Sequence, residues 1–439
     1  MRGSVRNRST WEYKVELGNQ PCQRCECGAR FWLERKPLDR CPKCGGELRE
    51  QTERRQSCVT GFATKKAAQA ALTDCLSSLQ RGTYVEPARI ILREYLTREW
   101  LPAIESTVKP STYLTYKVYV ERRIIPGIGN LPLQKLSGAT LNAFYGRLLT
   151  EPRAEVKPAA EGEEKPKAKP PLSALTVRHV HAVLHRALKD AVRWGYVPRN
   201  VADQADPPKT KTEAGRTLHV WTVAELQTFL ASTGEDRLYP LWTLLAMTGM
   251  RRGEVCGLRW SDMDLAAGVV AIQQARISVG YQVQISEPKT RRGRRAVDLA
   301  AGTLAVLKTW RKRQLEERME WGALWTDTGF VFTRENGLPW HPDRISKLFD
   351  ETVARVQKDQ REEAERTGDK DAKILPRIRL HDLRHTHATV ALAAGEHPKI
   401  VSERLGHANI AITLDTYSHV VPGLQKEAAA RIGALVFGG

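Results

Sequence analysis

The chain has 439 residues, of which 41% are hydrophobic and 27% are charged. This composition excludes fibrous and wholly disordered classes, and the length predicts two to four domains. The 69 Lys and Arg residues outnumber the 50 Asp and Glu residues, and the net charge of +19 favours a polyanionic partner, with plain solubility as the alternative. No run of roughly 20 apolar residues and no secretion signal is visible, so we expect a cytoplasmic protein without a membrane partner.

The first predicted domain, residues 1–87, combines a small β-sheet with one helix. Residues 11–17 alternate aromatic and β-branched positions, which is typical of a strand, and residues 53–62 are the expected antiparallel partner. An Ala-rich helix is predicted between Thr64 and Gly82. The sequence between the two strands is Cys-rich and is expected to form the loop of the hairpin.

Five of the eight cysteines lie in this loop, which favours a metal site in a reducing compartment over a disulfide framework. Cys41 and Cys44 precede two glycines, as in a zinc-knuckle turn. The upstream pair could be Cys22 with Cys25 or could include Cys27, so five cysteines compete for four positions. We expect a structural zinc ion in a zinc-ribbon insertion over about residues 20–50, with clustered free thiols as the alternative.

The second predicted domain, residues 88–206, is helical. Helical periodicity runs through four segments that end at Gly or Pro, namely residues 91–105, 111–129, 137–150 and 175–197. The tract 151–171 is rich in Pro, Ala, Lys and Glu and has no periodicity. We expect this tract to be a flexible loop between two helices, and the sequence leaves its role open.

The last predicted domain, residues 216–439, mixes helices with a β-rich region and follows a linker at 205–215. Thr222 begins a helix in a capping-box sequence, and strands are expected within 268–299. A mostly helical end follows. The polar stretch 357–373 is expected to be an exposed insertion between two of those helices.

Basic side chains gather at predicted helix ends in this last domain. Arg251 follows a glycine turn and opens a helix, with Glu254 one turn later on the same face. His381 and Arg384 also share a helical face, where one side chain can move a proton and the other can bind an anion. The adjacent His385 and His387 crowd the same helix, and spacing does not decide which of them faces a site.

A tyrosine completes the set. His407 follows a predicted helix end at Gly406, and Tyr417 lies ten residues later on the next helix. Singly, each residue has an ordinary alternative: a surface salt bridge, a capping histidine or a packed tyrosine. Together, two arginines, two histidines and a tyrosine are the groups that a phosphoryl transition state needs. The sequence offers no carboxylate cluster or Gly-rich phosphate loop for a metal-dependent or nucleotide-dependent mechanism.

Three ordered motifs, TGMRRGE with LRWSDMD, HDLRH, and LGHANIAITLDTYSH, resemble the catalytic domain of the tyrosine recombinases, the phage-type integrases, over residues 216–425. The resemblance implies a site-specific recombinase that cleaves and rejoins DNA through a 3′-phosphotyrosyl intermediate to integrate a phage or mobile element, without metal or ATP in catalysis. Tyr417 would be the nucleophile, Arg251 and Arg384 would clamp the phosphate, and His381 and His407 would handle proton transfer and hydrogen bonding.

The same resemblance extends to supporting residues and to the other domains. Lys289, in EPKTRRGRRAV, matches the family's general acid in a β-hairpin turn, with a DNA-backbone contact among Arg291, Arg292, Arg294 and Arg295 as the alternative. Glu254 matches the acid that holds Arg251. Residues 88–206 resemble the helical core-binding, SAM-like domain. Residues 1–87 resemble the arm-type DNA-binding domain of actinobacterial-type integrases, from which the Cys-rich insertion departs.

The expected fold is therefore multidomain and mainly α, with an α+β catalytic domain and a small N-terminal sheet. By the same resemblance, a homotetramer would act on two double-stranded DNA sites, with core and arm attachment sequences, in the bacterial cytoplasm and nucleoid. An excision or directionality factor is a further candidate partner. The alternatives are a non-catalytic DNA-binding regulator that keeps the fold, which the complete set of catalytic residues disfavours, and topoisomerase-like nicking and closing.

Overall fold

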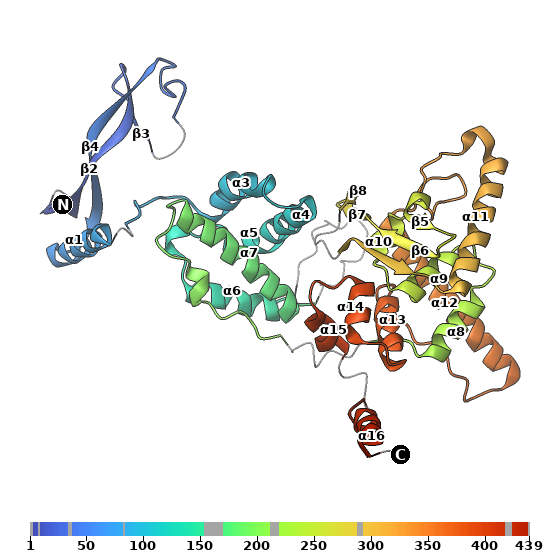
Figure 1. Ribbon diagram of the computed structural model, residues 1–439. Helices are drawn as coiled ribbons and strands as arrows, with labels where there is room; N and C mark the ends of the chain where they lie inside the picture. The colour runs from blue at the N-terminus through green and yellow to red at the C-terminus, as the bar shows by residue number, and fades with distance from the viewer. Residues whose placement is uncertain are drawn as a thin grey trace, which may run out of the picture. The chain divides into compact units, whose positions relative to one another are not determined.

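The structure is a computed structural model that describes residues 3–7, 9–33, 37–81, 84–152, 170–210, 219–287, 293–417 and 424–437. The chain divides into two compact units, Met1–Lys209 and Thr210–Gly439, whose elements are labelled in Figure 1. About 53% of the residues are helical and 17% are in strands, which confirms the mainly α prediction. Within the described part of the chain, no helix combines the length and apolar character needed to cross a membrane.

The first unit begins with an antiparallel sheet of four strands. The strands are β1 (Gly3–Asn7), β2 (Trp11–Cys25), β3 (Arg30–Trp32) and β4 (Leu48–Phe62). β4 pairs along almost the whole of β2, whereas β1 and β3 pair with opposite ends of β2. The predicted pairing of 11–17 with 53–62 is confirmed. Both strands are longer than predicted, so Cys22 and Cys25 lie on β2 rather than in a loop.

The continuation of β2 is hidden in the sequence by residues that are rare in strands. Gly18, Asn19 and Pro21 interrupt the apolar alternation, and such residues have low strand propensity. The ladder to β4 carries the strand across them, with a bulge near Gly18, whose φ is 82°. Pairing with a partner strand therefore overrides local propensity here.

Helix α1 (Lys65–Gln80) packs on one end of this sheet, as Figure 1 shows. The Thr64 side chain accepts a hydrogen bond from the Ala67 N–H and caps the helix. Leu72 and Cys75 of α1 are buried with Tyr13 and Val15 of β2 in a small apolar cluster. The predicted Ala-rich helix is confirmed, and the end of the sheet that it covers is the only described part of the sheet with an aliphatic and aromatic core of this kind.

The rest of the first unit is helical. Its elements are α2 (Leu92–Glu94), a π-helical turn η1 (Tyr95–Trp100), α3 (Leu101–Glu105), α4 (Pro110–Tyr119), a second π-helical turn η2 (Val120–Ile124), α5 (Ile125–Ile128), the 3-10 turns η3 (Leu133–Lys135) and η4 (Val201–Gln204), α6 (Gly138–Thr150) and α7 (Ala174–Arg193). The four predicted helical segments are confirmed. Each π-helical turn precedes a proline, Pro102 or Pro126, whose missing N–H and bulky ring disturb the regular ladder. Most of the 151–171 tract lies outside the described residues.

The second unit contains helices around two small sheets. Its elements are α8 (Val223–Ser232), α9 (Tyr239–Thr248), α10 (Arg252–Cys256), η6 (Trp260–Asp262), β5 (Met263–Asp264), β6 (Val269–Ile272), β7 (Ala275–Val279), β8 (Gln282–Ser286), β9 (Arg295–Asp298), α11 (Ala301–Trp321), η8 (Gly322–Leu324), α12 (Pro342–Thr367), α13 (Asp382–Ala393), α14 (Pro398–Leu405), α15 (Ile410–Tyr417) and α16 (Leu424–Phe437). One sheet has the order β5-β6-β9, and β7 and β8 form a hairpin. The predicted capping box at Thr222 is confirmed, since its hydroxyl accepts from the Glu225 N–H.

The stretch 357–373 is largely exposed, as expected, but the expectation that it separates two helices is wrong for its first eleven residues. Helix α12 continues to Thr367, with buried Val353 and Val356 on its inner face. Its outer face carries ion pairs four residues apart, among them Lys358 with Glu362. A polar stretch without apolar positions can therefore be the solvent-facing end of a long helix.

An aromatic core holds the helices that carry the functional residues. Trp221 and Phe229 at α8, Trp242 on α9 and Phe349 on α12 are almost fully buried. The Phe349 ring centroid lies 5.4 Å from that of Trp242 and 5.6 Å from that of Phe229, with edge-to-face geometry. This packing fixes α9, whose C-terminal end leads into the site.

Candidate active site

Arg251 is positioned by the end of α9. Gly249 terminates the helix with a φ of 63°, and a Cβ atom there would lie 2.5 Å from Leu405, so the turn requires glycine. The turn makes Arg251 the N-cap of α10. Its guanidinium donates to Glu254 Oε1 at 2.8 Å and to the Gly406 carbonyl at 3.3 Å. Because 41% of the Arg251 side chain is exposed, the oriented cation can still meet an anion from solvent.

Glu254 is a buried carboxylate between two arginines. It accepts the Arg251 backbone N–H at 2.9 Å and two guanidinium N–H groups of Arg295 at 3.0 and 3.2 Å. Burial raises the pKa of Glu254, but the Arg295 and Arg251 contacts outweigh burial and leave the pKa lowered. The carboxylate is therefore charged, and it forms an ion pair with the Arg251 guanidinium.

Arg295 is a site residue that the sequence did not single out from the neighbouring basic residues. Only 7% of its side chain is exposed, and its Nε donates to the Arg404 carbonyl at 2.5 Å. The alternation of β9 could have predicted its burial, because residues two apart in a strand share a face and Arg295 lies two residues before the buried Val297.

Arg384 is the most enclosed cation of the site, with 3% of the residue exposed. Its two terminal nitrogens donate to the carbonyl groups of Gly249 and Leu405, each at 2.7 Å. These acceptors lie at the ends of α9 and α14, where helix dipoles favour a positive charge. Burial, followed by the charge of Arg251, lowers the pKa of Arg384 to about 9, so the guanidinium remains protonated at neutral pH.

His381 and His385 stand side by side at the start of α13. Their ring centroids are 5.2 Å apart, with the planes perpendicular. His381 is an exposed residue, yet the burial of part of its ring, and then the neighbouring His385 and Arg384, lower the pKa of His381 to about 4. His385 points toward α15, where its Nδ1 lies 2.7 Å from the hydroxyl oxygen of Tyr417.

His407 follows the end of α14, as predicted, after Gly406 adopts a φ of 68°. Its Nδ1 lies 2.8 Å from the hydroxyl of Thr413, a fully buried residue of α15. Burial, then the charges of Arg384 and Arg251, lowers the pKa of His407 to about 4. The imidazole is therefore neutral at pH 7 while facing both arginines.

Tyr417 is the last residue of α15, and 1% of it is exposed. It packs in a small apolar cluster with Ala388, Leu392, Val401 and Leu405. Burial raises the pKa of Tyr417 to about 12, and the nearby Arg384 charge opposes this rise. The hydroxyl group is thus a protonated, covered group in this structure.

The structure therefore brings together five of the six predicted catalytic residues, Arg251, His381, Arg384, His407 and Tyr417, and also Glu254. The sixth, Lys289, lies outside the described residues. Of the two histidines that spacing left undecided, His385 contacts Tyr417, whereas the Nδ1 of His387 is 3.0 Å from the Ala246 carbonyl.

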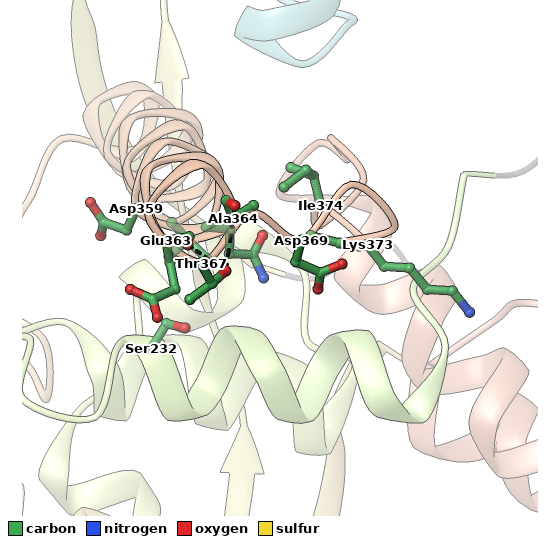
Figure 2. Close-up of a pocket in the computed structure, with 11 residues that line it drawn as sticks. Ser232, Asp359, Glu363, Ala364, Thr367, Asp369, Lys373 and Ile374 are labelled. Carbon is green, nitrogen blue, oxygen red and sulfur yellow. Dashed lines mark hydrogen bonds between the residues drawn. The ribbon is translucent and has the colours of Figure 1, made fainter.

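A basic cavity of about 420 Å³ lies beside this cluster. Its lining residues are Arg294, Arg295, Lys399, Ser402, Glu403, Gly406, His407, Asn409 and Ile410. Another cavity, of about 350 Å³, lies at the ends of α8 and α12, where Asp359, Glu363 and Lys373 line it (Figure 2). None of the predicted catalytic residues lines this second cavity, so the basic cavity is the one that belongs to the site.

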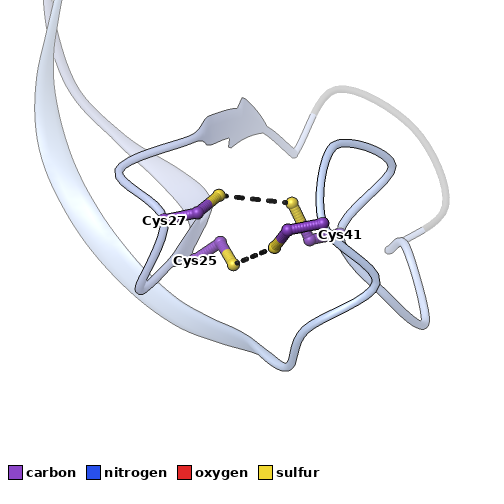
Figure 3. Close-up of side chains that lie close together, drawn as sticks. Cys25, Cys27 and Cys41 are labelled. Atoms are coloured by element: carbon purple, nitrogen blue, oxygen red, sulfur yellow. Dashed lines mark hydrogen bonds between the residues drawn. The ribbon is translucent and has the colours of Figure 1, made fainter.

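A second cluster of reactive side chains lies at the far end of the N-terminal sheet. The sulfur atoms of Cys25, Cys27, Cys41 and Cys44 all lie within 4.8 Å of one another. The Cys25–Cys44 and Cys27–Cys41 sulfur separations are 3.3 and 3.7 Å, and Figure 3 shows the side chains converging from β2 and from the facing loop. Cys22 is buried on β2 but is not a member of this cluster.

Two tight turns present these thiols. The N–H of Gly28 donates to the Cys25 carbonyl at 2.9 Å, and the N–H of Gly45 donates to the Cys41 carbonyl at 2.8 Å. Gly28 and Gly45 have φ values of 84° and 73°. Burial raises the pKa of Cys41, but backbone N–H groups of Lys43 and Cys44 outweigh burial and lower the pKa to about 7, which favours the thiolate that a metal requires.

Comparison with known proteins agrees with this geometry. The model of the phage integrase family matches residues 220–422, and the model of the phage integrase N-terminal SAM-like domain matches residues 92–149. A tyrosine recombinase XerC-like protein of Caldanaerobacter subterraneus subsp. tengcongensis is 24% identical over 389 residues, which cover 85% of this chain and 90% of the relative. The ICEBs1 integrase of Bacillus subtilis is 24% identical over 340 residues, covering 77% of this chain and 81% of the relative.

The fold has close counterparts among solved structures. A structure of the Tn1549 transposon integrase in complex with transposon right end DNA has a TM-score of 0.60 and 20% sequence identity, covering 79% of this chain and 100% of that chain. The two family models together match more than half of the sequence, in the order and at the positions of the helical bundle and the catalytic cluster. The chain belongs to the phage integrase family of tyrosine recombinases.

Proposed function

We propose that this protein is a site-specific DNA recombinase in which Tyr417 attacks a DNA phosphodiester and forms a 3′-phosphotyrosyl intermediate. The observation that carries the proposal is the convergence of Arg251, Arg384, His407 and Tyr417 from four helix ends around one small volume. Such a group of cations, neutral imidazoles and a phenol suits an anionic phosphoryl transition state without a metal.

The two arginines act as the phosphate clamp. Arg384 is held by the Gly249 and Leu405 carbonyls, and Arg251 is held by Glu254, so neither has to be ordered when DNA arrives. Preorganised donors of this kind stabilise charge that develops in the transition state, and losing one such donor costs about 3 kcal/mol. The basic cavity beside His407 is the proposed seat of the sugar-phosphate backbone.

The histidines contribute as neutral groups. The pKa values of His381 and His407 are both lowered to about 4, so in the free protein each can donate one hydrogen bond and accept another. A bound phosphate offsets the surrounding positive charge and raises both values. Protonation of the leaving 5′ oxygen is assigned to Lys289, on the family resemblance alone.

The nucleophile must be uncovered before it reacts. Tyr417 is 1% exposed and is a protonated phenol with a pKa near 12, so attack requires both access to phosphorus and removal of the proton. Since the phosphotyrosyl ester conserves the energy of the broken diester, no nucleotide is consumed. The same intermediate allows religation to a different strand, which is recombination rather than hydrolysis.

We further propose that Cys25, Cys27, Cys41 and Cys44 hold a structural zinc ion. Zinc bound by four thiolates at about 2.3 Å in tetrahedral geometry places the sulfur atoms about 3.8 Å apart, which matches the compactness of the cluster. Apolar packing contributes little to the stability of this tip, where Phe31 and Leu48 are only partly buried against the small cluster. A bound metal would therefore hold the distal end of the sheet together.

The domain assignments follow the same logic. We propose that residues 1–87 bind arm-type DNA, residues 88–206 bind the core site and residues 216–439 carry out catalysis, in a homotetramer on two duplex sites in the bacterial nucleoid. In support, the apolar cluster of the sheet lies within residues 5–84 and that of the helical bundle within 90–205, so the two have separate cores. The Tn1549 integrase was solved with transposon right end DNA, which supports a DNA partner here.

The test is covalent capture on DNA. The wild-type chain and Tyr417→Phe are incubated, without added metal or nucleotide, with nicked duplexes that carry the junction sequences of the element encoding the protein. A protein–DNA band that withstands denaturant in the wild type and disappears in the variant is the expected result. Duplex binding by both proteins without any covalent band would favour the non-catalytic regulator. On a supercoiled plasmid that carries two sites, relaxation of the plasmid without strand exchange between the sites would favour a topoisomerase.

A further inference from the structure

The hydroxyl group of Tyr417 has a partner to which the family resemblance gives no role. The Nδ1 atom of His385 lies 2.7 Å from the hydroxyl oxygen, and the two ring centroids are 5.7 Å apart. We propose that His385 is the general base that accepts the Tyr417 proton during strand cleavage and returns it during religation. This inference rests on the proposed recombinase function and adds a catalytic residue to it.

The distance between His385 and Tyr417 and the raised pKa of Tyr417 both support a general base at this position. A general base must lie within about 2.6–3.2 Å of the atom that it deprotonates, and the His385–Tyr417 distance satisfies this range. Burial places the Tyr417 pKa near 12, so spontaneous ionisation at neutral pH is very rare. A contact that moves the proton in step with attack removes the need for a free phenolate.

One buried neighbour of His385, Asp382, favours the positive charge that His385 would acquire. The charged or titratable groups that face it are His381, Asp382 and Arg384 on its own helix, Tyr417 on α15 and His407 before α15. Asp382 is 3% exposed, and Arg379 fixes its carboxylate through contacts of 2.8 and 3.0 Å. This buried carboxylate attracts an imidazolium at position 385.

Arg384 is the opposing charge next to His385. In the free protein it makes protonation of His385 less favourable. When a phosphodiester binds Arg384 and Arg251, its negative charge offsets theirs, so the basicity of His385 rises as the substrate arrives. Proton removal from the nucleophile is thereby coupled to occupation of the clamp.

The other two histidines have different contacts. His407 Nδ1 is engaged with the Thr413 hydroxyl, and its ring faces the arginines. His381 meets His385 edge to face and lies at the exposed start of α13. We therefore assign the phosphate oxygens to His407 and His381, and the nucleophile to His385.

In cleavage, the O–H bond of Tyr417 breaks and the proton moves to Nδ1 of His385, while the tyrosine oxygen bonds to phosphorus. The bond from phosphorus to the 5′ oxygen breaks, and the leaving oxygen takes a proton from the general acid, the role given to Lys289. In religation a 5′ hydroxyl returns its proton to that acid and attacks phosphorus, and the departing phenolate recovers its proton from His385.

The test compares the wild type with a variant that keeps the hydrogen bond to Tyr417 but loses the basic nitrogen. In His385→Asn the amide reaches about as far as Nδ1 but does not titrate. We expect DNA binding to be unchanged, strand cleavage at pH 7 to fall about 100-fold, and the rate to keep rising with pH where the wild type levels off. Replacing Tyr417 by a more acidic fluorotyrosine should restore at least about tenfold of the loss, because the proton then leaves more easily.

The matched control is His387→Asn, two residues further along α13, where the amide can replace Nδ1 as donor to the Ala246 carbonyl. Its cleavage rate and pH profile should match the wild type. A second variant, His385→Ala, leaves space for added imidazole, which should restore cleavage at least about tenfold and keeps the test valid if His385→Asn folds poorly.

The outcomes separate the two proposals. Cleavage by His385→Asn at the wild-type rate and with the wild-type pH profile would overturn the base assignment while leaving Tyr417 as nucleophile. Faster cleavage by His385→Asn would overturn it in favour of a contact that merely restrains Tyr417. Absence of any adduct with the wild type would overturn the recombinase function and the base together.

Discussion

The cysteine tip of the N-terminal sheet and the catalytic cluster of the second unit differ in how their side chains are held in place. The four tip cysteines lie within 20 residues of sequence and have little apolar packing around them. The catalytic residues span Arg251 to Tyr417 and are held by buried ion pairs, helix-end carbonyls and an aromatic core. Local spacing therefore suffices to recognise the first cluster, whereas the second depends on the fold.

The largest expected effect is at the cysteine tip. Cys41→Ser should abolish stoichiometric zinc binding and unfold the distal part of the sheet, because metal binding contributes about 10–16 kcal/mol in small zinc modules. Zinc content and amide hydrogen exchange of residues 19–55 measure this. The matched control is Cys22→Ser, which should leave zinc content unchanged because Cys22 lies outside the cluster. Equal zinc loss in both variants would contradict the proposed ligand set.

In the catalytic unit the largest effect should come from Glu254→Ala. The substitution leaves Arg295, with 7% of its side chain exposed, as a buried cation without this carboxylate. Breaking a buried pair in this way costs about 3–5 kcal/mol of folding free energy. Chemical denaturation measures the loss, and Glu287→Ala, which removes an exposed contact to Arg294, is the control. Similar stabilities for the two variants would count against the role of Glu254.

Arg384→Ala should act on catalysis more than on binding. The variant loses a phosphate clamp worth about 3 kcal/mol, so cleavage should fall about 100-fold or more while most duplex affinity remains. Single-turnover cleavage and binding titrations on the same duplex separate the two quantities. Retained cleavage would refute the clamp assignment.

These contrasts explain which features the sequence could predict. Periodicity and caps located the helices, and the Thr222 capping box and the Gly406 helix end are local signals that the structure confirms. Cysteine spacing identified the tip but left five candidates, because choosing among them depends on where β2 ends. The continuation of β2 was missed because pairing with β4, rather than local propensity, determines it. The continuation of α12 was missed because residues 357–367 lack an apolar periodicity, although their Glu, Gln, Lys and Arg residues favour a helix.

Side-chain contacts between segments far apart in the sequence could not be predicted for a different reason. The His385–Tyr417 hydrogen bond joins residues 32 apart on different helices, and the Arg295–Glu254 pair joins residues 41 apart. Spacing places a residue on a helix or strand, but which neighbour it meets depends on how the elements pack. Motifs could therefore single out five histidine, arginine and tyrosine residues of the cluster, while the partners that these side chains contact could not be predicted.

The smallest effect should be the pH dependence of stability. The pKa values of His387 and His407 are lowered to about 4 in the fold, whereas a histidine in the unfolded chain has a pKa of about 6.5. When the pH is lowered from 7 to 5, these two histidines take up protons in the unfolded state but not in the folded state. The free energy of unfolding should therefore decrease as the pH is lowered, by about 1 kcal/mol for each histidine after allowing for solvent screening. Denaturation at both pH values measures this, and His387→Asn should remove its share. A pH-independent stability would contradict the enclosed, neutral state of both rings.

The most direct measurement is to identify the amino acid that carries the DNA. A trapped protein–DNA complex is digested with protease and nuclease, and the modified peptide is sequenced by mass spectrometry. The account predicts a 3′-nucleotide phosphate on Tyr417, in the peptide that contains α15. A phosphate linked to another residue, or a 5′ linkage, would contradict the central claim that the cluster around Arg251, Arg384 and Tyr417 is the site of strand cleavage.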